Sequence, residues 1–215
     1  MSGLAALLLA DGRFPGGGHA HSGGLEAAVA DGSVTGLATF QSFLAGRVTT
    51  IGAVDAWLAA VACLGADPLV LDAEADARCP SPAMRAASRR LGRGLRRAVG
   101  RSFPAVAECG AEHQAVVIGV AAAVAGLSPE DAARWAIHGI AASAASAAVR
   151  LLAMDAADAM AVALALAGLG DEVSATAAAR ARAGGALADG PAWSAPLLEL
   201  RAEAHARWEV RLFAS

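Results

Sequence analysis

Apolar residues run along most of this 215-residue chain without the strict alternation that marks a half-buried β-strand. Alanine, the strongest helix former, supplies most of them, and no segment carries a sustained alternation of Val, Ile and Thr. The pattern therefore predicts an all-α protein. Because alanine side chains are small, the helices have to approach one another closely, or bury part of their surface against partner proteins.

Capping residues show where several of the predicted helices begin. Asp67-Pro68, Ser81-Pro82 and Ser128-Pro129 each place a polar cap before a proline at the first helical position. The helices that they open are predicted over about 68–78, 82–99 and 129–152. Further helices are predicted over 4–10, 25–30, 36–47, 50–64 and about 196–208. About nine or ten helices with short connections indicate one compact multi-helix bundle, and we expect a single domain over residues 1–215.

The charged residues argue against one class of partner. All 17 cationic residues are arginine, and the formal net charge is −3. A mildly acidic chain lacks the general basic face that nucleic-acid binding needs, so we expect no nucleic-acid partner. One segment is rich in arginine, and we interpret it as a solvated or partner-facing surface. Its members are Arg85, Arg89, Arg90, Arg93, Arg96, Arg97 and Arg101.

The cysteines and the apolar stretches indicate where the protein works. The three cysteines, odd in number and in no metal-binding spacing, are Cys63, Cys79 and Cys109. Such usage is typical of a reduced, cytoplasmic compartment. No apolar stretch reaches the roughly 20 uninterrupted residues of a membrane span. The longest cover 115–127, 136–154 and 156–170, the second being interrupted by His138 and Arg150. We therefore expect a soluble protein with no membrane partner.

Residues 12–26, GRFPGGGHAHSGGLE, raise the question of a ligand site. A phosphate-binding P-loop needs a lysine, and the chain has none. A dinucleotide-binding loop needs a preceding buried strand, whereas residues 4–10 are predicted as a short apolar helix. The three glycines at 16–18 instead allow a sharp bend after Pro15.

His19 and His21 are the candidate metal ligands in this loop. Imidazole suits nickel and zinc, but two histidines at i and i+2 do not close a site by themselves. The other soft candidates are isolated along the sequence: Cys63, Cys109, His113, His138 and His205. We therefore expect hydrogen-bonding or interface roles for His19 and His21, with metal binding as the weaker alternative. His113 and His138, alone on apolar helices, are expected to be core or packing residues.

Ser22 is the candidate nucleophile, and it lacks the features of one. The sequence has no G-x-S-x-G turn around it, and no carboxylate is evidently placed to orient a histidine. Ser22 is better explained as the cap of a helix over 25–30, with Glu26 as its first-turn acid. We expect no catalytic residues, and a small α-helical hydrolase built around Ser22 is disfavoured.

Four motifs, in order along the chain, resemble the urease accessory protein F (UreF) family, in an actinobacterial form. The N-terminal signature is carried by Pro15, Gly17, Gly18, His21, Ser22, Gly24, Leu25 and Glu26. HQAVVIG (113–119), SAAVRLLAMD (146–155) and the ending from Pro196 to Ser215 resemble three later family segments. Three positions depart from the family pattern: His19 replaces an aromatic residue, Ala115 a proline, and Asp155-Ala156 a Gly-Gln pair. Whatever that Gly-Gln pair does elsewhere is not carried over to this chain.

The resemblance implies a function that composition does not show. Members of the family are all-α, typically dimeric and not enzymes. They bind the urease accessory protein D (also called H) and recruit the GTPase G, and this complex delivers nickel to apo-urease, whose active-site lysine must also be carbamylated. We therefore expect no tightly bound cofactor, in a pathway that uses nickel, GTP and carbon dioxide. The alternative is a direct nickel relay that uses His19 and His21.

The resemblance also selects candidate partner-binding residues. They are Gly17, Gly18, His19, His21, Ser22, Glu26, Arg211, Leu212, Phe213 and Ser215. The last four belong to a tail over about 206–215, which is expected to order on binding the D/H protein, or else is only a frayed end. We expect Arg211 to lie near His19 or His21, so that loop and tail form one surface. For Ser22 and Glu26, a pure capping role is the alternative. Arg150 is expected to pair with a carboxylate, either inside the chain or on the GTPase.

Overall fold

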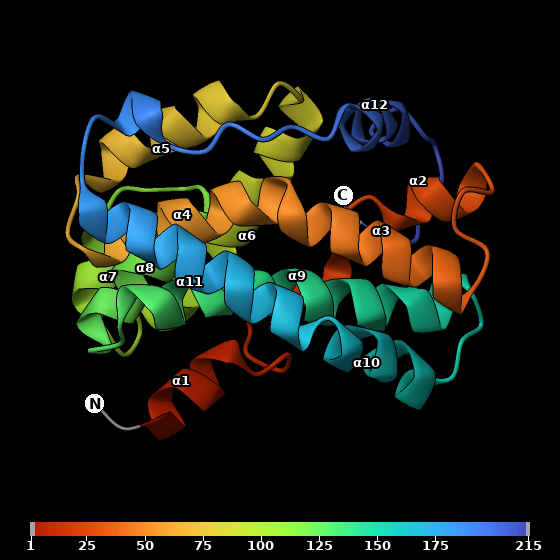
Figure 1. Cartoon of the computed structure of the whole chain (residues 1–215), viewed down its shortest axis with the longest axis horizontal. Helices are drawn as coiled ribbons and strands as arrows, with labels where there is room; N and C mark the ends of the chain where they lie inside the picture. The colour runs from red at the N-terminus through yellow and green to blue at the C-terminus, as the bar shows by residue number, and fades with distance from the viewer. Residues whose placement is uncertain (1–2, 214–215) are drawn as a thin grey trace.

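The computed structural model describes residues 3–213, apart from the side chain of His19. Within these residues the chain forms twelve α-helices and two short 3-10 turns, η1 and η2, and contains no strand (Figure 1). The helices are α1 (Gly3–Ala10), α2 (Leu25–Ala30), α3 (Leu37–Thr49), α4 (Ile51–Cys63), α5 (Pro68–Arg78), α6 (Pro82–Val99), α7 (Pro104–Glu108), α8 (Gln114–Val124), α9 (Pro129–Leu151), α10 (Ala156–Ala165), α11 (Ala167–Ala183) and α12 (Pro196–His205). The all-α fold expected from the sequence is confirmed.

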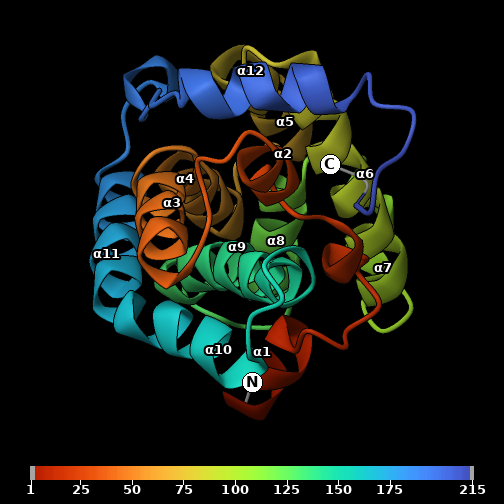
Figure 2. The same ribbon diagram turned by 90° about the vertical axis from the view of Figure 1, so that its right-hand side faces the viewer.

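Helix α9 is the central element of the bundle. It is the longest helix, with 23 residues, and it begins with a capping box in which Ser128 and Asp131 bond each other's backbone N–H groups. Figure 2, which looks nearly along α9, shows it surrounded by α3, α4, α8, α11 and α10. Ten of its residues are buried, seven of them alanine. The core therefore forms around α9.

Small residues let the helices around α9 approach one another closely. A Cβ atom added to Gly119 of α8 would lie 2.3 Å from the carbonyl oxygen of Ala59 and 2.5 Å from the Cβ of Ala62, both in α4. Ala59 and Ala62 are themselves buried. The close approach expected of an alanine-rich chain is thus present, with backbone packed almost directly on backbone.

Helices α3 and α4 together form an apolar segment, Leu37–Cys63, that is long enough to cross a membrane. Half of its most apolar window is nevertheless buried inside the bundle. Phe40 and Leu44 of α3 and Leu58 of α4 are almost inaccessible to solvent, and the segment also carries Arg47 and Asp55. These are properties of core helices in a soluble fold.

The predicted helix boundaries agree with the structure at several helices, including α5 and α6, which begin with a capping residue and a proline. Helices α2, α5 and α6 begin and end as predicted, and α9 ends one residue before the predicted 152. The last helix ends at His205 rather than 208, because the chain turns there, with the N–H of Trp208 bonded to the carbonyl of His205. Two features were not predicted: the five-residue α7, and a 45° bend between α10 and α11.

Candidate partner-binding site at the C-terminal tail

The glycine-rich loop passes between α3 and α12 before α2 begins. Gly23 and Gly24 have φ values of +60° and +90°, which favour glycine. A Cβ atom at Gly23 would lie 1.5 Å from Arg47 Nη1, and one at Gly24 would lie 2.2 Å from Leu198 Cδ1. Both positions therefore favour glycine for their conformation, and a larger residue would also displace the ends of the Arg47 and Leu198 side chains.

Ser22 and Glu26 join this loop to the start of α2. The Ser22 hydroxyl oxygen accepts a hydrogen bond from the backbone N–H of Glu26 at 3.3 Å, so Ser22 satisfies a first-turn N–H as expected, although the N-cap position of α2 is Gly24. Ser22 is 0% exposed and Glu26 is 7% exposed. Neither side chain is accessible to a partner protein in this structure. Any effect of Ser22 or Glu26 on partner binding is therefore indirect, through the segments to which they are hydrogen-bonded.

Glu26 holds the C-terminal tail. Its carboxylate accepts hydrogen bonds from the backbone N–H groups of Leu212 at 2.8 Å and Phe213 at 3.1 Å, and it lies 2.8 Å from His205 Nε2. Because an ionised carboxylate only accepts, that imidazole nitrogen carries the hydrogen. The His205 ring also packs against Trp208, with ring centroids 4.8 Å apart. The carboxylate thus fixes the tail directly and through the end of α12.

The anchored tail buries one apolar side chain and exposes others. Phe213 is 4% exposed, and the Arg150 guanidinium lies 5.7 Å above its ring. Leu212 is 70% exposed and Val210 is 84% exposed. Within residues 3–213 no carboxylate forms an ion pair with Arg150, which lies exposed at the end of α9 and packs on Phe213. A pairing with a carboxylate of the GTPase stays a prediction.

Two acidic contacts fix α12, which carries the tail. The Glu203 carboxylate accepts from the Ser81 hydroxyl at 2.5 Å and from the Ala83 N–H at 2.8 Å, and these two bonds hold the pKa of Glu203 below its usual range. Arg201 donates to Asp31 at 2.7 Å, at the end of α2. Hydrogen bonding to Ser33 and then to Arg201 lowers the pKa of Asp31. The end of α12 is therefore tied to both α6 and α2.

The remaining candidate residues are placed as follows. His21 is buried, with 6% of its surface exposed, and Gly17 takes the left-handed conformation at the bend, directly before η1 (Gly18–Ala20). Arg211 is exposed and forms no hydrogen bond or ion pair with another described residue, so the structure does not pair it with His21. The His19 side chain and Ser215 lie outside the described residues. Loop and tail meet through Glu26 rather than through Arg211.

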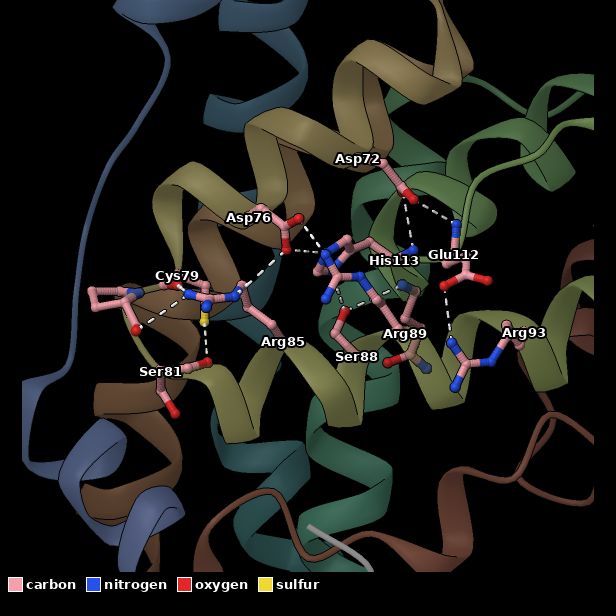
Figure 3. A network of polar contacts seen from close by, with 12 residues as sticks. Asp72, Asp76, Cys79, Ser81, Arg85, Ser88, Arg89, Arg93, Glu112 and His113 are labelled. Atoms are coloured by element: carbon pink, nitrogen blue, oxygen red, sulfur yellow. Dashed lines mark hydrogen bonds and ion pairs between the residues drawn. The ribbon is translucent and has the colours of Figure 1, made fainter. Parts of the chain in front are cut away.

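A second polar network lies between α5, α6 and the start of α8 (Figure 3). His113, 3% exposed, has Nδ1 3.0 Å from the Ser88 hydroxyl and Nε2 2.9 Å from Asp76. Asp76 also forms ion pairs with Arg85 and Arg89. The prediction that His113 is a packing residue is confirmed.

This network refines the interpretation of the arginine segment as a solvated or partner-facing surface. Arg90, Arg93, Arg97 and Arg101 are exposed, as interpreted, whereas Arg85, Arg89 and Arg96 are partly buried. Arg85 and Arg89 form ion pairs with Asp76, and Arg96 donates to the carbonyl of Ala111 at 3.0 Å. Acids on α5 and arginines on α6, spaced by three or four residues, were the available signal, since such spacing gathers them on one face of their own helix.

The structure offers few metal-binding or nucleophilic groups. Within the described part of the chain, no group of three or more His, Cys, Asp and Glu side chains is arranged to hold a metal ion. His138 was expected to be a core or packing residue, but it is exposed, because it lies on the side of α9 that faces a groove beside α10. The three cysteines are unpaired thiols.

Comparison with known proteins agrees with the motif order along the chain. The UreF family model matches residues 34–167. A protein of Mycolicibacterium vanbaalenii described as urease accessory protein UreF is 45% identical over 223 residues, and one of Mycobacterium tuberculosis with the same description is 43% identical over 221 residues. Both alignments cover 100% of each chain. The chain therefore belongs to the UreF family of urease accessory proteins.

Proposed function

We propose that this protein is a urease maturation factor that acts as a non-enzymatic scaffold and GTPase regulator. It binds the urease accessory D/H protein, recruits the GTPase G and assists nickel insertion into apo-urease in the cytoplasm. The observation that carries the proposal is full-length similarity to proteins described as urease accessory protein UreF. In this role the chain holds no tight cofactor of its own, and nickel, GTP and carbon dioxide are used by the complex.

The anchored tail supports a docking role for this end of the molecule. Leu212 and Val210 are large apolar side chains that are mostly exposed, and they follow the turn in which the buried His205 packs against Trp208. Exposed apolar side chains next to a polar rim are typical of a protein-binding patch. Arg211 adds one charged group between them. The D/H protein is the partner that we assign to this surface.

Co-expression with the D/H and G proteins, followed by pull-down, tests the proposal. A chain that lacks residues 206–215 is expected to lose the D/H protein, and undiminished capture contradicts the assignment. A sharper version compares Leu212→Glu with Leu69→Glu on α5, since the two leucines are 70% and 61% exposed. Only Leu212→Glu is expected to weaken capture, while the thermal stability of both variants stays close to that of the native chain.

A direct nickel relay through His19 and His21 is the alternative, and it has less support. His21 is buried, and no cluster of three potential ligands exists among the described side chains, which do not include that of His19. Equilibrium dialysis against nickel distinguishes the two roles. Tight stoichiometric binding that is lost in the His19→Ala/His21→Ala pair favours the relay, whereas weak binding that this pair leaves unchanged favours the scaffold.

The scaffold is proposed to work as a homodimer. Exposed leucines gather on α1 and α10, which lie on the same side of the bundle in Figures 1 and 2. They include Leu4, Leu7 and Leu8 of α1 and Leu164 of α10, all between 59% and 72% exposed. A second copy of the chain is the occupant that we assign to this face.

A further inference from the structure

Four exposed arginines follow one another along the outer face of α6. Arg90, Arg93 and Arg97 lie on the helix, and Arg101 comes directly after Gly100, which keeps helical angles of φ −59° and ψ −20°. At 3.6 residues per turn, the four positions fall within an arc of about 80° and span about 16 Å. We call these four residues the arginine stripe. Figure 2 shows α6 at the edge of the bundle, near α12 and α7.

The chain itself neutralises little of this charge. Arg93 Nη1 donates to the Glu112 carboxylate at 2.9 Å. Arg90, Arg97 and Arg101 form no ion pair with another described residue. No aspartate or glutamate occurs between residues 77 and 107. The stripe is therefore a surface of one sign, with the single carboxylate of Glu112 paired to it.

The start of α9 shows how a solvated helix face is built in this chain. Arg134 pairs with Glu130 on its own helix and with Asp171 of α11, and such mixed signs are typical of a face that meets water. The stripe instead repeats one charge, and like charges spaced three or four residues apart repel each other. The helix dipole offsets this repulsion in the last turn, at Arg97, but not at Arg90. Carboxylates placed along the stripe relieve it.

We infer that the arginine stripe is a docking surface for an acidic helix of another protein. Each guanidinium presents a planar fork that binds one carboxylate through two hydrogen bonds. A helix with acids at i, i+3, i+7 and i+11 places one carboxylate opposite each arginine. None of the described helices of this chain carries four acids at that spacing, so a second copy does not supply the partner. This surface is separate from the tail, and the inference does not depend on the maturation role.

Two other anionic partners fit the stripe less well. Proteins that bind duplex DNA commonly contact about 6–10 phosphates, whereas the stripe offers four cations and has a carboxylate, Glu112, beside Arg93. A helix that lies on an anionic membrane needs large apolar side chains beside its basic ones. Within residues 82–99 no large apolar side chain is exposed. A short acidic protein segment matches both the number and the spacing of the arginines.

Fluorescence anisotropy on the native protein tests the surface with a labelled helical peptide that carries glutamates at i, i+3, i+7 and i+11. At low salt we expect saturable binding with a dissociation constant on the order of 100 μM, weakened severalfold when added salt shortens the Debye length. A peptide of the same composition, with its glutamates distributed around the helix, is expected to bind at least about fivefold more weakly. Equal binding of the two peptides, or no saturable binding, overturns the inference.

Two further probes test the other partners. They are a labelled thymine oligonucleotide of similar length, measured by anisotropy, and vesicles of phosphatidylserine and phosphatidylcholine, measured by co-sedimentation. Both are expected to bind more weakly than the matched peptide. Tighter binding of either one overturns the assignment to an acidic protein.

Matched charge-reversal variants locate the binding. Arg90→Glu/Arg97→Glu is expected to bind the matched peptide at least about tenfold more weakly, because two guanidinium forks are lost. Arg180→Glu/Arg182→Glu on α11 makes the same change in net charge at two other exposed arginines and is expected to bind like the native protein. Arg90→Gln/Arg97→Gln, which reverses no charge, is expected to weaken binding as well. Circular dichroism verifies folding, and equal weakening by the α6 and α11 reversals contradicts the inference.

Discussion

At the residue scale, the buried carboxylate of Glu26 fixes the position of the C-terminal tail. Glu26 was singled out in the sequence as a first-turn acid, where it complements the helix dipole. In the structure its carboxylate instead meets His205 and two backbone N–H groups of the tail. The partners lie 179 to 187 residues away along the chain, and no local pattern predicts them. Charge-assisted bonds of this kind are about twice as strong as neutral ones.

Replacing Glu26 by Ala is expected to release the tail. The change removes the acceptor of Leu212 and Phe213, and we expect a loss of about 1–3 kcal/mol in the free energy of unfolding. Hydrogen exchange at these two amides, measured by NMR, is the direct readout. Glu209→Gln is the matched control, because Glu209 is an exposed acid of the same tail. Equal protection of Leu212 and Phe213 in both variants contradicts the anchor.

Asp55 predicts a pH-dependent stability difference. Burial raises its folded pKa to about 6, above the unfolded value of 3.8, so the folded state binds more protons between these pH values. Its contribution to stability is therefore lost as pH rises from about 4 to 6, by up to roughly 3 kcal/mol. Asp55→Asn removes this dependence. Thermal unfolding is expected to show that Asp55→Asn is more stable than the native chain at pH 8 and about equally stable at pH 4. A stability difference that is the same at both pH values contradicts the prediction.

At the scale of elements, glycine sets the distance between α4 and α8. Gly119→Ala places a methyl group 2.3 Å from the carbonyl oxygen of Ala59, and backbone has to move to admit it. We expect destabilisation by about 1–3 kcal/mol, measured by thermal unfolding. Gly46→Ala in α3 is the control: no atom lies within 4 Å of its added Cβ, so the helix gains about 0.5–1 kcal/mol. A similar loss in both variants contradicts the close-packing argument.

At the scale of the whole molecule, the apolar face of α1 and α10 predicts self-association. Leu164→Glu is expected to shift the protein from dimer to monomer, because it places a charge among the exposed leucines. Size-exclusion chromatography with light scattering measures the change. Leu69→Glu, at similar exposure on another face, is expected to leave the dimer intact. A native chain that is monomeric at every concentration contradicts the homodimer.

The sequence by itself located eight of the twelve helices in residues 3–213, and it placed both ends of α2, α5 and α6. Capping residues and prolines at 67–68, 81–82 and 128–129 act within one turn, so α5, α6 and α9 could be placed without tertiary information. The order of motifs likewise identified the family. Alanine content and the absence of alternation were sufficient for the fold class.

Only the tertiary structure decided which polar residues meet. His205 looked isolated along the sequence, yet it has a specific partner, Glu26, on another helix. Within residues 3–213, Arg150 packs on Phe213 rather than against a carboxylate. Hydrogen bonds and ion pairs form over a few ångströms, and the distances between helices depend on packing of the whole core. The sequence therefore named the candidate residues of the tail site, and the fold alone brought Glu26 and the tail together.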